Sequence, residues 1–442
     1  MGFSLPANSI DLSLVICGSA GQGLASLEIL LTRLALLTGY NIFSTQEYMS
    51  RIRGGSSSVQ IRFSPEKVSA PVERIDLLMP LTKESLLRLR ARIGKETLII
   101  GDRSLMTEEI IDACGLYIDI PFIEVAKEIG QNIYLNQVVM GLLSRLLGID
   151  PDIAEQQVSA FFEVKGEKVT ALNVKALKHG YSICDGLMDR AGEDCLQLKL
   201  ESNDAGSNKG ELLIGFGEAV GLGAIAGGCD FLAAYPMSPS TGVLSFLAAQ
   251  AKEFDIIVEQ CEDEIAGINM ALGAWYAGSR ALASTSGGGF ALMEEGVSLG
   301  AMIESPVVIH IAQRPGPATG LPTRTEQGDL ELALYSGHGE FSRIILAPGS
   351  ISEAFYLTQQ AFNLADRFQI PVFILTDQYL MDTRVNTTPF DLAGLQVESH
   401  IIETDESYKR YAFTDTGLSP RGIPGFGKGL VMVDSDEHDE TG

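Results

Sequence analysis

Short apolar runs alternate with amphipathic helical patterns in the first 200 residues of this 442-residue chain. Continuous apolar runs bounded by turn residues are typical of buried strands, and apolar residues every three or four positions are typical of helices. The expected strands are 12–17, 40–45, 59–63, 75–80 and 97–101, and the expected helices are 24–37, 82–93, 132–147, 152–163 and 167–188. Such alternation predicts an α/β domain with a parallel, doubly wound sheet.

The same alternation returns after residues 201–210, a polar segment of small residues that is typical of a linker. The expected strands beyond it are 231–235, 256–259, 281–285, 307–312 and 372–376, and the expected helices are 217–228, 241–254, 263–276 and 290–302. We therefore expect the α/β fold class with two doubly wound parallel-sheet domains, one over 1–200 and one over 211–400.

Composition narrows the class of protein. Hydrophobic residues make up 45% of the chain and charged residues 20%, as in a globular protein with a large core. The first 200 residues carry 20 basic and 24 acidic side chains, whereas the remainder carries 12 and 33. This acidity argues against nucleic acid and anionic membrane as partners. We find no membrane-spanning run and no signal-peptide pattern, so a cytoplasmic location is expected.

The six cysteines do not form a metal-binding pattern. The two that lie nearest in sequence are eleven positions apart, and the chain contains no C-x-x-C motif. The usual spacings of zinc and iron–sulfur ligands are therefore excluded, and we expect no metal site on this chain.

Four segments between positions 235 and 330 carry the candidate chemistry. In each of them an apolar run gives way to glycine, proline or small polar residues, which places all four at strand ends. Open α/β sheets bind their ligands at such ends. The segments are Tyr235-Pro-Met-Ser-Pro-Ser-Thr241, Glu262-Asp-Glu-Ile-Ala266, Thr285-Ser-Gly-Gly-Gly-Phe290 and Gln313-Arg-Pro-Gly-Pro-Ala-Thr-Gly-Leu-Pro-Thr-Arg-Thr-Glu-Gln327.

Three residues in these segments are candidates for binding or catalysis, and each has a structural alternative. Two prolines would present Ser238 on a rigid turn, although a purely structural turn is the alternative. The guanidinium of Arg314 can bind a carboxylate through two hydrogen bonds, or can form an ion pair with one of the many nearby acids. Glu264 begins a helix, where a carboxylate also complements the helix dipole, and Glu262 is the runner-up for the same role.

Two stretches of the first domain are candidates for binding phosphate. The turn Gly18-Ser-Ala-Gly-Gln-Gly23 between a strand and a helix is either an anion cradle or simply a tight turn. Arg51 and Arg53, in the glycine-ended loop 47–55, either bind an oxyanion or lie in a solvated or salt-bridged loop.

The four segments, in this order and spacing, resemble the α subunit of 2-oxoacid:ferredoxin (acceptor) oxidoreductases. The 2-oxoglutarate type, with a γ-like domain fused at the N-terminus, is the most similar, and the resemblance covers nearly the whole chain. It implies a γ-like domain over 1–200 and a domain that binds the pyrimidine of thiamine diphosphate over 211–400. Residues 401–442 resemble the family's link toward a C-terminal domain that we expect to be absent.

The resemblance also implies roles for particular residues. Glu264 would be catalytic, because its carboxylate would pair with the N1′ nitrogen of the aminopyrimidine and promote ionisation of the cofactor. Ser238 and Arg314 would bind the 2-oxoacid substrate, with Thr319, Thr323, Arg324 and Thr325 as second-line candidates. The residues expected to line the cofactor are Tyr235, Pro236, Gly287, Gly288 and Gly289, and those expected near coenzyme A are Arg51 and Arg53.

This sequence departs from the family pattern at two of these segments. Met237 and Ser238 stand where the family usually has isoleucine and threonine, so the hydroxyl is kept while the pocket wall changes. The three glycines 287–289 stand where the family often has Gly-Pro-Gly, which predicts a more flexible loop.

The resemblance implies partners, because the chain lacks a Gly-Asp-Gly run followed by asparagine. It assigns the cofactor's diphosphate, Mg²⁺ and a [4Fe–4S] cluster to a separate β subunit, so we expect a hetero-oligomer that is inactive without that subunit. The expected reaction is oxidative decarboxylation of a 2-oxoacid, with coenzyme A as acyl acceptor and ferredoxin or a similar protein as electron acceptor. 2-Oxoglutarate is favoured by overall similarity, but no residue excludes pyruvate or a branched-chain 2-oxoacid. A non-oxidative thiamine-dependent decarboxylase or synthase subunit, or a non-catalytic scaffold subunit, are the alternatives.

Overall fold

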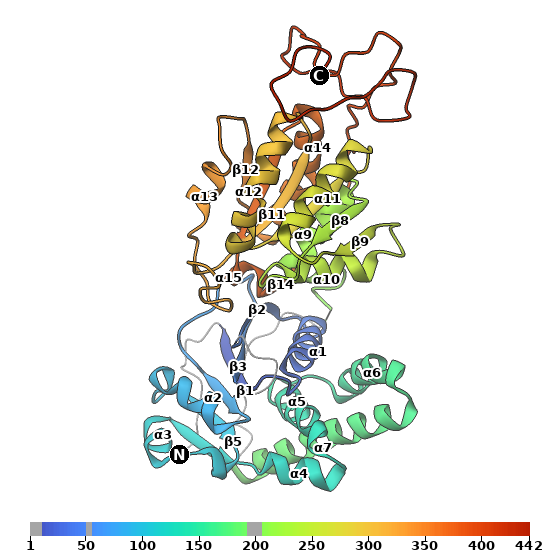
Figure 1. Cartoon of the computed structure of the whole chain (residues 1–442). Coiled ribbons are helices and arrows are strands. Elements are labelled where there is room, and N and C mark those ends of the chain that lie inside the picture. The colour runs from blue at the N-terminus through green and yellow to red at the C-terminus, as the bar shows by residue number, and fades with distance from the viewer. Residues whose placement is uncertain (1–10, 50–54, 192–205) are drawn as a thin grey trace. The chain divides into compact units, whose positions relative to one another are not determined.

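The computed structural model describes residues 11–49, 55–191 and 206–442. It divides the chain into two compact units, which are considered separately below (Figure 1). The first unit comprises residues 1–213 and 383–389, and the second comprises 214–382 and 390–442. Within the described residues, no helix combines the length and the apolar composition that crossing a lipid bilayer requires.

A mixed sheet forms the centre of the first unit. Its strand order is β6-β5-β4-β1-β3-β2-β14-β7, and the boundary between the units falls within β7. β1, β4, β5 and β6 pair in parallel, whereas β3 pairs antiparallel with both β1 and β2. The strands are β1 (Leu12–Ser19), β2 (Asn41–Glu47), β3 (Ser56–Ser64), β4 (Leu77–Pro80), β5 (Leu98–Gly101), β6 (Leu116–Asp119), β7 (Leu212–Gly215) and β14 (Thr383–Thr387).

The α/β class is confirmed, but this sheet differs from the expected all-parallel arrangement. The connection between β2 and β3 spans only residues 48–55, whereas a crossover between parallel strands needs about a dozen residues or more. These two strands therefore pair antiparallel. β14, which the sequence analysis placed inside the second domain, pairs antiparallel with β2.

Helices cover both faces of this sheet. Alternate residues of β1 face opposite ways: Leu14 and Ile16 belong to a large core with α1 and the later helices, and Val15 and Cys17 to a smaller core with α2 and α3. The α-helices are α1 (Leu24–Leu37), α2 (Lys83–Arg88), α3 (Glu108–Ala113), α4 (Phe122–Ile129), α5 (Leu135–Leu146), α6 (Pro151–Phe162) and α7 (Glu167–Ala191), and the short 3₁₀ helices are η1 (Arg90–Arg92), η2 (Arg103–Leu105), η3 (Asn132–Tyr134) and η4 (Glu163–Lys165).

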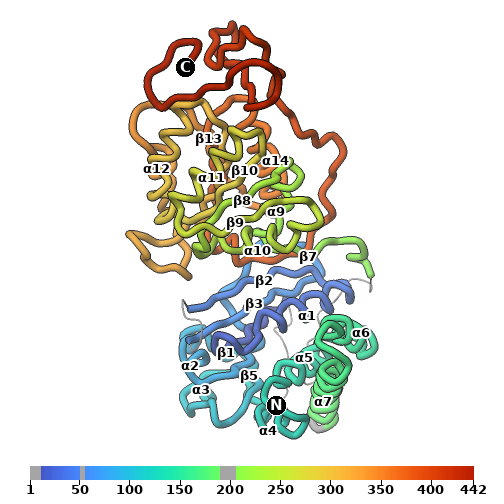
Figure 2. The backbone as a smooth tube through the Cα atoms, turned by 45° about the vertical axis from the view of Figure 1, so that its right-hand side comes forward, coloured from blue at the N-terminus to red at the C-terminus, as the bar shows by residue number. Residues whose placement is uncertain are grey.

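The second unit is built on a sheet in which every pairing is parallel. Its strand order is β12-β13-β11-β10-β8-β9. Figure 2 labels β13, β10, β8 and β9 of this sheet. The chain runs from β8 outward to β9 and then returns to β10 on the other side of β8, so the direction of strand addition reverses between β8 and β10. The strands are β8 (Phe231–Ala234), β9 (Ile257–Gln260), β10 (Ala281–Thr285), β11 (Val307–Gln313), β12 (Ile344–Leu346) and β13 (Pro371–Asp377).

Helices enclose the central strands of this second sheet, and β10, β11 and β13 are buried along their whole length. Within the sheet, His310 bridges the hydroxyls of Ser284 and Thr376 at 2.9 Å each, and burial lowers its pKa to about 3. The imidazole is therefore a neutral structural bridge. The helices are α9 (Phe216–Ala226), α10 (Thr241–Gln250), α11 (Glu264–Tyr276), α12 (Gly287–Met302), α13 (Leu330–Leu334), α14 (Ile351–Phe368) and α15 (Gln378–Met381).

A buried charge cluster attaches the C-terminal segment to this unit. Residues 390–442 form isolated bridges but no helix or strand. Within this segment, Arg421 reaches Asp366 of α14 at 2.8 Å, and Arg280 binds the other carboxylate oxygen at 3.1 Å. All three side chains are buried, so Asp366 neutralises cations that would otherwise be costly to bury.

We expect Asp366→Asn to destabilise the second unit by about 3–5 kcal/mol, because it leaves two buried guanidinium groups without their carboxylate. Urea denaturation at pH 7 measures this change. Glu440→Gln, which removes a carboxylate from the exposed pair with Lys409, is the matched control and should leave the urea midpoint almost unchanged. Equal midpoints for Asp366→Asn and the unmodified protein would contradict this account of the cluster.

Candidate functional site

The four predicted segments all follow strand ends at one edge of the second sheet. They come directly after β8, β9, β10 and β11, which are neighbours in that sheet. Because these strands are parallel, their carboxyl ends share one edge. The direction in which strands are added to the sheet reverses between β8 and β10, and such a reversal opens a crevice in an α/β sheet where ligands bind. The fold therefore gathers the segments as expected.

Glu264 is the first residue of α11 and is only 2% exposed. The helix is capped by Asp263, whose carboxylate accepts the Ala266 backbone N–H at 2.8 Å. The Glu264 carboxylate accepts one long hydrogen bond, 3.4 Å, from the hydroxyl of Thr285 at the end of β10. Burial raises the pKa of the Glu264 carboxyl, whereas the alternative candidate, Glu262, is exposed. Of the two candidate carboxylates, only that of Glu264 is therefore buried at this edge of the sheet.

The three glycines form the first turn of α12 instead of a free loop, because the helix begins at Gly287 and not at position 290. A Cβ atom on Gly289 would lie closer than 3.0 Å to the Glu264 carboxylate and to the Thr285 hydroxyl. A Cβ atom on Gly288 would lie 3.2 Å from the carbonyl oxygen of Ala318. Glycine at position 289 therefore leaves the space in which the Glu264 side chain lies.

Arg314 immediately follows β11 and is 7% exposed. Its Nη1 donates to the carbonyl oxygen of Ser238 at 2.6 Å, which joins the segment after β11 to the segment after β8. Burial lowers the pKa of Arg314, and the negative charges of Glu264 and Asp329 oppose that shift. Arg314 forms no ion pair with any residue that the structure describes, so the ion-pair alternative is not realised there.

The turn after β8 is held by its own hydrogen bonds. The Ser240 hydroxyl donates to the Met237 carbonyl oxygen at 2.6 Å, and the Ser238 side chain is partly exposed. Tyr235 is 38% exposed and Pro236 is also exposed. The turn therefore presents a hydroxyl and an aromatic ring at the sheet edge.

The second-line candidates lie in the loop that continues from Arg314. Thr319 and Thr325 are exposed, and Thr323 and Arg324 are partly exposed. The Arg324 guanidinium donates to the Thr323 carbonyl oxygen at 2.7 Å.

Sequence reasoning assigned no role to three polar residues beside this edge: Thr285 and Ser286, which belong to a predicted segment, and Asp329, which belongs to none. The Ser286 hydroxyl, the Nε of Arg314 and one oxygen of Asp329 are buried without a hydrogen-bond partner among the described residues. Buried polar groups normally have partners, so unpaired groups in the segments at this sheet edge fit a polar ligand here. No glycine or proline pattern singles out Asp329 in the sequence, and only its nearness to Arg314 in space reveals it.

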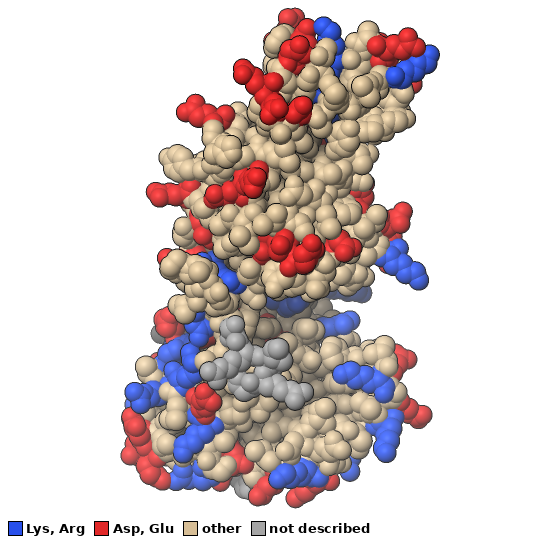
Figure 3. Space-filling model, viewed as in Figure 1, with Lys and Arg blue, Asp and Glu red and all other residues tan. Residues whose placement is uncertain are grey.

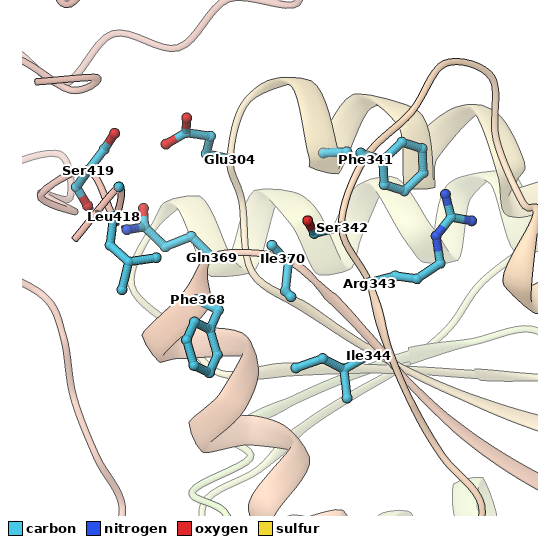
Figure 4. A pocket seen from close by; sticks show the side chains of 12 residues that line it. Glu304, Phe341, Ser342, Arg343, Ile344, Phe368, Gln369, Ile370, Leu418 and Ser419 are labelled. Atoms are coloured by element: carbon cyan, nitrogen blue, oxygen red, sulfur yellow. Dashed lines mark hydrogen bonds between the residues drawn. The ribbon is translucent and has the colours of Figure 1, made fainter. Parts of the chain in front are cut away.

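Other hollows lie away from this edge. An open hollow of about 520 Å³ is lined by residues such as Phe341, Arg343, Gln369 and Ser419, next to the first residues of β12 and β13 at the opposite edge of the second sheet (Figure 4). It contains none of the predicted site residues. Acidic side chains are prominent on the face of the second unit shown in Figure 3.

The glycine turn of the first unit also borders a hollow, of about 310 Å³, between residues 19–25, 46–49 and 57–59. Gly21 and Gly23 adopt positive φ angles, and the Ser19 backbone N–H donates to the Gln22 side chain at 2.7 Å. Arg51 and Arg53 lie outside the described residues, so their role stays a prediction.

We expect Gly289→Ala to destabilise the protein by about 1–3 kcal/mol, because the space beside Gly289 is already occupied and the new methyl group would overlap the Glu264 carboxylate. Gly288→Ala is the matched control, because its methyl group would lie 3.2 Å from one carbonyl oxygen. We expect this variant to lose less stability than Gly289→Ala. Thermal unfolding of both variants measures the difference. A loss for Gly288→Ala that equals or exceeds that for Gly289→Ala would contradict the packing described.

Comparisons with known proteins show which family this chain resembles. A family model described as "Pyruvate flavodoxin/ferredoxin oxidoreductase, thiamine diP-bdg" matches residues 222–442, and one described as "Pyruvate ferredoxin/flavodoxin oxidoreductase" matches residues 13–183. The 2-oxoacid:ferredoxin oxidoreductase subunit alpha of Sulfolobus sp is 31% identical over 98% of this chain and 75% of its own length. The 2-oxoglutarate synthase subunit KorA of Archaeoglobus fulgidus is 45% identical over 38% of this chain and 48% of its own.

A solved structure extends the similarity to the fold. The 2-oxoglutarate:ferredoxin oxidoreductase from Magnetococcus marinus, solved with 2-oxoglutarate, coenzyme A and succinyl-CoA bound, matches with a TM-score of 0.88 and 30% identity. The match covers 98% of this chain and 75% of that one. Together with the two family models, these matches confirm the resemblance seen in the sequence: the chain belongs to the family of 2-oxoacid:ferredoxin oxidoreductase α subunits.

Proposed function

We propose that this chain binds the aminopyrimidine of thiamine diphosphate at the carboxyl edge of its second sheet and there supports oxidative decarboxylation of 2-oxoglutarate. The observation that carries the proposal is the buried carboxylate of Glu264 at a sheet edge whose segments also hold buried, unpaired polar atoms. The relatives that are named for 2-oxoglutarate support the choice of substrate.

Thiamine diphosphate would supply, when bound, a nucleophilic carbon and a cationic thiazolium ring that is the sink for the electron pair released when CO₂ leaves a 2-oxoacid. Glu264 would hold the ring nitrogen N1′ through a hydrogen bond. Burial raises the pKa of the Glu264 carboxyl, and a raised pKa favours a shared or donated proton at this atom. Thr285 donates to the same carboxylate and helps to hold it in position.

Arg314 would bind the 1-carboxylate of the 2-oxoacid. Its Nη1 is already committed to the Ser238 carbonyl oxygen, and this bond limits the movement of the guanidinium. Its Nε, which has no partner among the described residues, remains able to donate. An anchored arginine in a buried site can orient a carboxylate for reaction. The Ser238 hydroxyl and the glycines 287–289 would lie beside the substrate and the ring.

Coenzyme A would bind near the glycine turn of the first unit. That turn precedes the long helix α1, and backbone N–H groups at a helix N-terminus favour phosphate. Arg51 and Arg53 are proposed to bind phosphate or carboxylate groups in the same region.

A β subunit that binds Mg²⁺, the diphosphate and a [4Fe–4S] cluster would complete the site. Among the described residues, no cluster of histidine, cysteine, aspartate and glutamate could hold a metal ion.

We propose the surface of α11 and α12 as the contact with this partner. A groove of about 860 Å³ runs along it, and Ile265 and Leu292 on its walls are each 50% exposed. Ile265 directly follows Glu264, so a partner seated there would lie beside the site. Ferredoxin would then receive the electrons from the cluster.

We expect Glu264→Gln to lower kcat about 10²–10⁴-fold, because glutamine cannot exchange a proton with the ring nitrogen. The chain and its β partner are produced together, and anaerobic viologen reduction is followed with thiamine diphosphate, coenzyme A and either 2-oxoglutarate or pyruvate. Glu262→Gln, which changes an exposed carboxylate two positions away, is the matched control and should remain within about twofold of the unmodified complex.

Three outcomes of this assay are decisive. Loss of activity in Glu264→Gln with the complex intact supports the assignment, and unchanged activity would favour a non-catalytic role for this chain. Faster reduction with pyruvate than with 2-oxoglutarate would overturn the proposed substrate. A stable complex with its cluster that decarboxylates a 2-oxoacid without reducing viologen would favour a non-oxidative reaction.

A further inference from the structure

A small cavity lies within the second unit, where the C-terminal segment packs on the ends of α11 and α12. Its volume is about 20 Å³, which is room for a single guest of the size of a water molecule. The last residues of α11, the residues that follow α12 and the C-terminal segment line it. Two of the lining residues are buried arginines, Arg410 and Arg421, which are 3% and 4% exposed.

Each of these arginines uses part of its guanidinium group at a helix end. Nη2 of Arg410 donates to the carbonyl oxygen of Glu304, just beyond α12, at 2.7 Å. Nη1 of Arg421 donates to the carbonyl oxygen of Trp275, in the last turn of α11, at 3.3 Å, and its Nη2 donates to Asp366 at 2.8 Å. The remaining nitrogens are not all satisfied, because Nη1 of Arg410 and Nε of Arg421 are buried without a hydrogen-bond partner among the described residues.

Buried positive charge exceeds buried negative charge at this place. The carboxylate of Asp366 already serves both Arg280 and Arg421. Nη1 of Arg410 lies 3.7 Å from the Glu304 carboxylate, whose side chain is 38% exposed, so that contact is longer than a hydrogen bond and is screened by water. Burial lowers the pKa of Arg410, and the positive charge of Arg421 lowers it further. The two guanidinium groups therefore repel each other, and within the described part of the chain no carboxylate binds both.

The chemistry of the cavity favours an anion over water. A water molecule could accept hydrogen bonds from both arginines, but it is neutral and would leave the excess charge uncompensated. The partial negative charge at the C-terminal ends of α11 and α12 offsets part of this excess, so a singly charged anion fits better than a divalent one. The small volume also excludes polyatomic anions such as phosphate.

We propose that this cavity is a binding site for a chloride ion, which accepts hydrogen bonds from Nη1 of Arg410 and Nε of Arg421. The ion would serve these two arginines as the Asp366 carboxylate serves Arg280 and Arg421. It would also strengthen the attachment of the C-terminal segment to the ends of α11 and α12. Binding of this ion does not depend on the reaction proposed above.

Thermal unfolding of the full chain tests the site in solution. Sodium chloride is exchanged stepwise for sodium gluconate at constant ionic strength, because gluconate is too large for the cavity. A ligand that binds the folded chain alone raises its unfolding temperature, and we expect a value about 2–5 °C higher in chloride than in gluconate.

Two variants separate this effect from a general effect of salt. Arg410→Met removes one of the two donors but keeps an unbranched apolar side chain, and it should reduce the difference between chloride and gluconate to less than about 1 °C. Arg367→Met, which changes an exposed arginine of the same unit, is the matched control and should keep the full difference. A difference that Arg410→Met retains in full would overturn the proposal.

A diffraction measurement decides the question without any variant. Crystals of the full chain are grown with bromide in place of chloride, and anomalous data are collected at the bromine absorption edge. We expect an anomalous peak in the cavity, in contact with both arginines. A cavity without such a peak would overturn the proposal. A peak without a chloride-dependent rise in the unfolding temperature would show binding at crystal concentration only, and would overturn it as well.

Discussion

Parallel pairing in the second sheet is the constraint on which the rest of this structure depends. The carboxyl ends of parallel strands lie at the same edge of the sheet. Residues separated by about eighty positions in the sequence therefore lie near one another there. Ser238, Glu264 and Arg314 come from three different strand ends, and each is placed by the strand that precedes it. The single hydrogen bond from Arg314 to the Ser238 carbonyl oxygen then joins two of these ends directly.

Burial determines the electrostatics of this edge. Glu264 and Arg314 carry opposite charges and influence each other, yet each is surrounded mainly by protein and makes few hydrogen bonds. An arginine that was neutralised by a close carboxylate would bind a substrate carboxylate less well. The far side of the same unit shows the contrast, because there Arg280 and Arg421 share the carboxylate of Asp366 and serve the attachment of the C-terminal segment.

Much of the second unit could be predicted from the sequence, because continuous apolar runs such as 281–285 and 307–312 are long enough to mark buried strands. The position of Glu264 at a helix start followed from the same pattern. Antiparallel pairing of β3 could not be predicted from periodicity, since a side-chain period of two is common to both kinds of sheet. The pairing of β14 with β2 joins residues more than 330 positions apart, and no local pattern encodes it.

The contacts between individual side chains could not be predicted from the sequence either. Asp329 carries no motif, and its contact with the start of α12 depends on how the loop 315–328 folds back. The glycine run was interpreted as room for a cofactor, whereas the structure shows that Gly289 also leaves space for Glu264. The candidate residues were identified from the resemblance to a family. The packing of the second unit explains why those residues lie together.

The most direct test of this account is a structure of the complex with thiamine diphosphate bound. It should place a Glu264 carboxylate oxygen within hydrogen-bond distance, about 2.6–3.2 Å, of the N1′ atom of the aminopyrimidine. A ring bound at this edge but paired with a different residue, or a ring bound away from the ends of β8 and β10, would contradict the central claim.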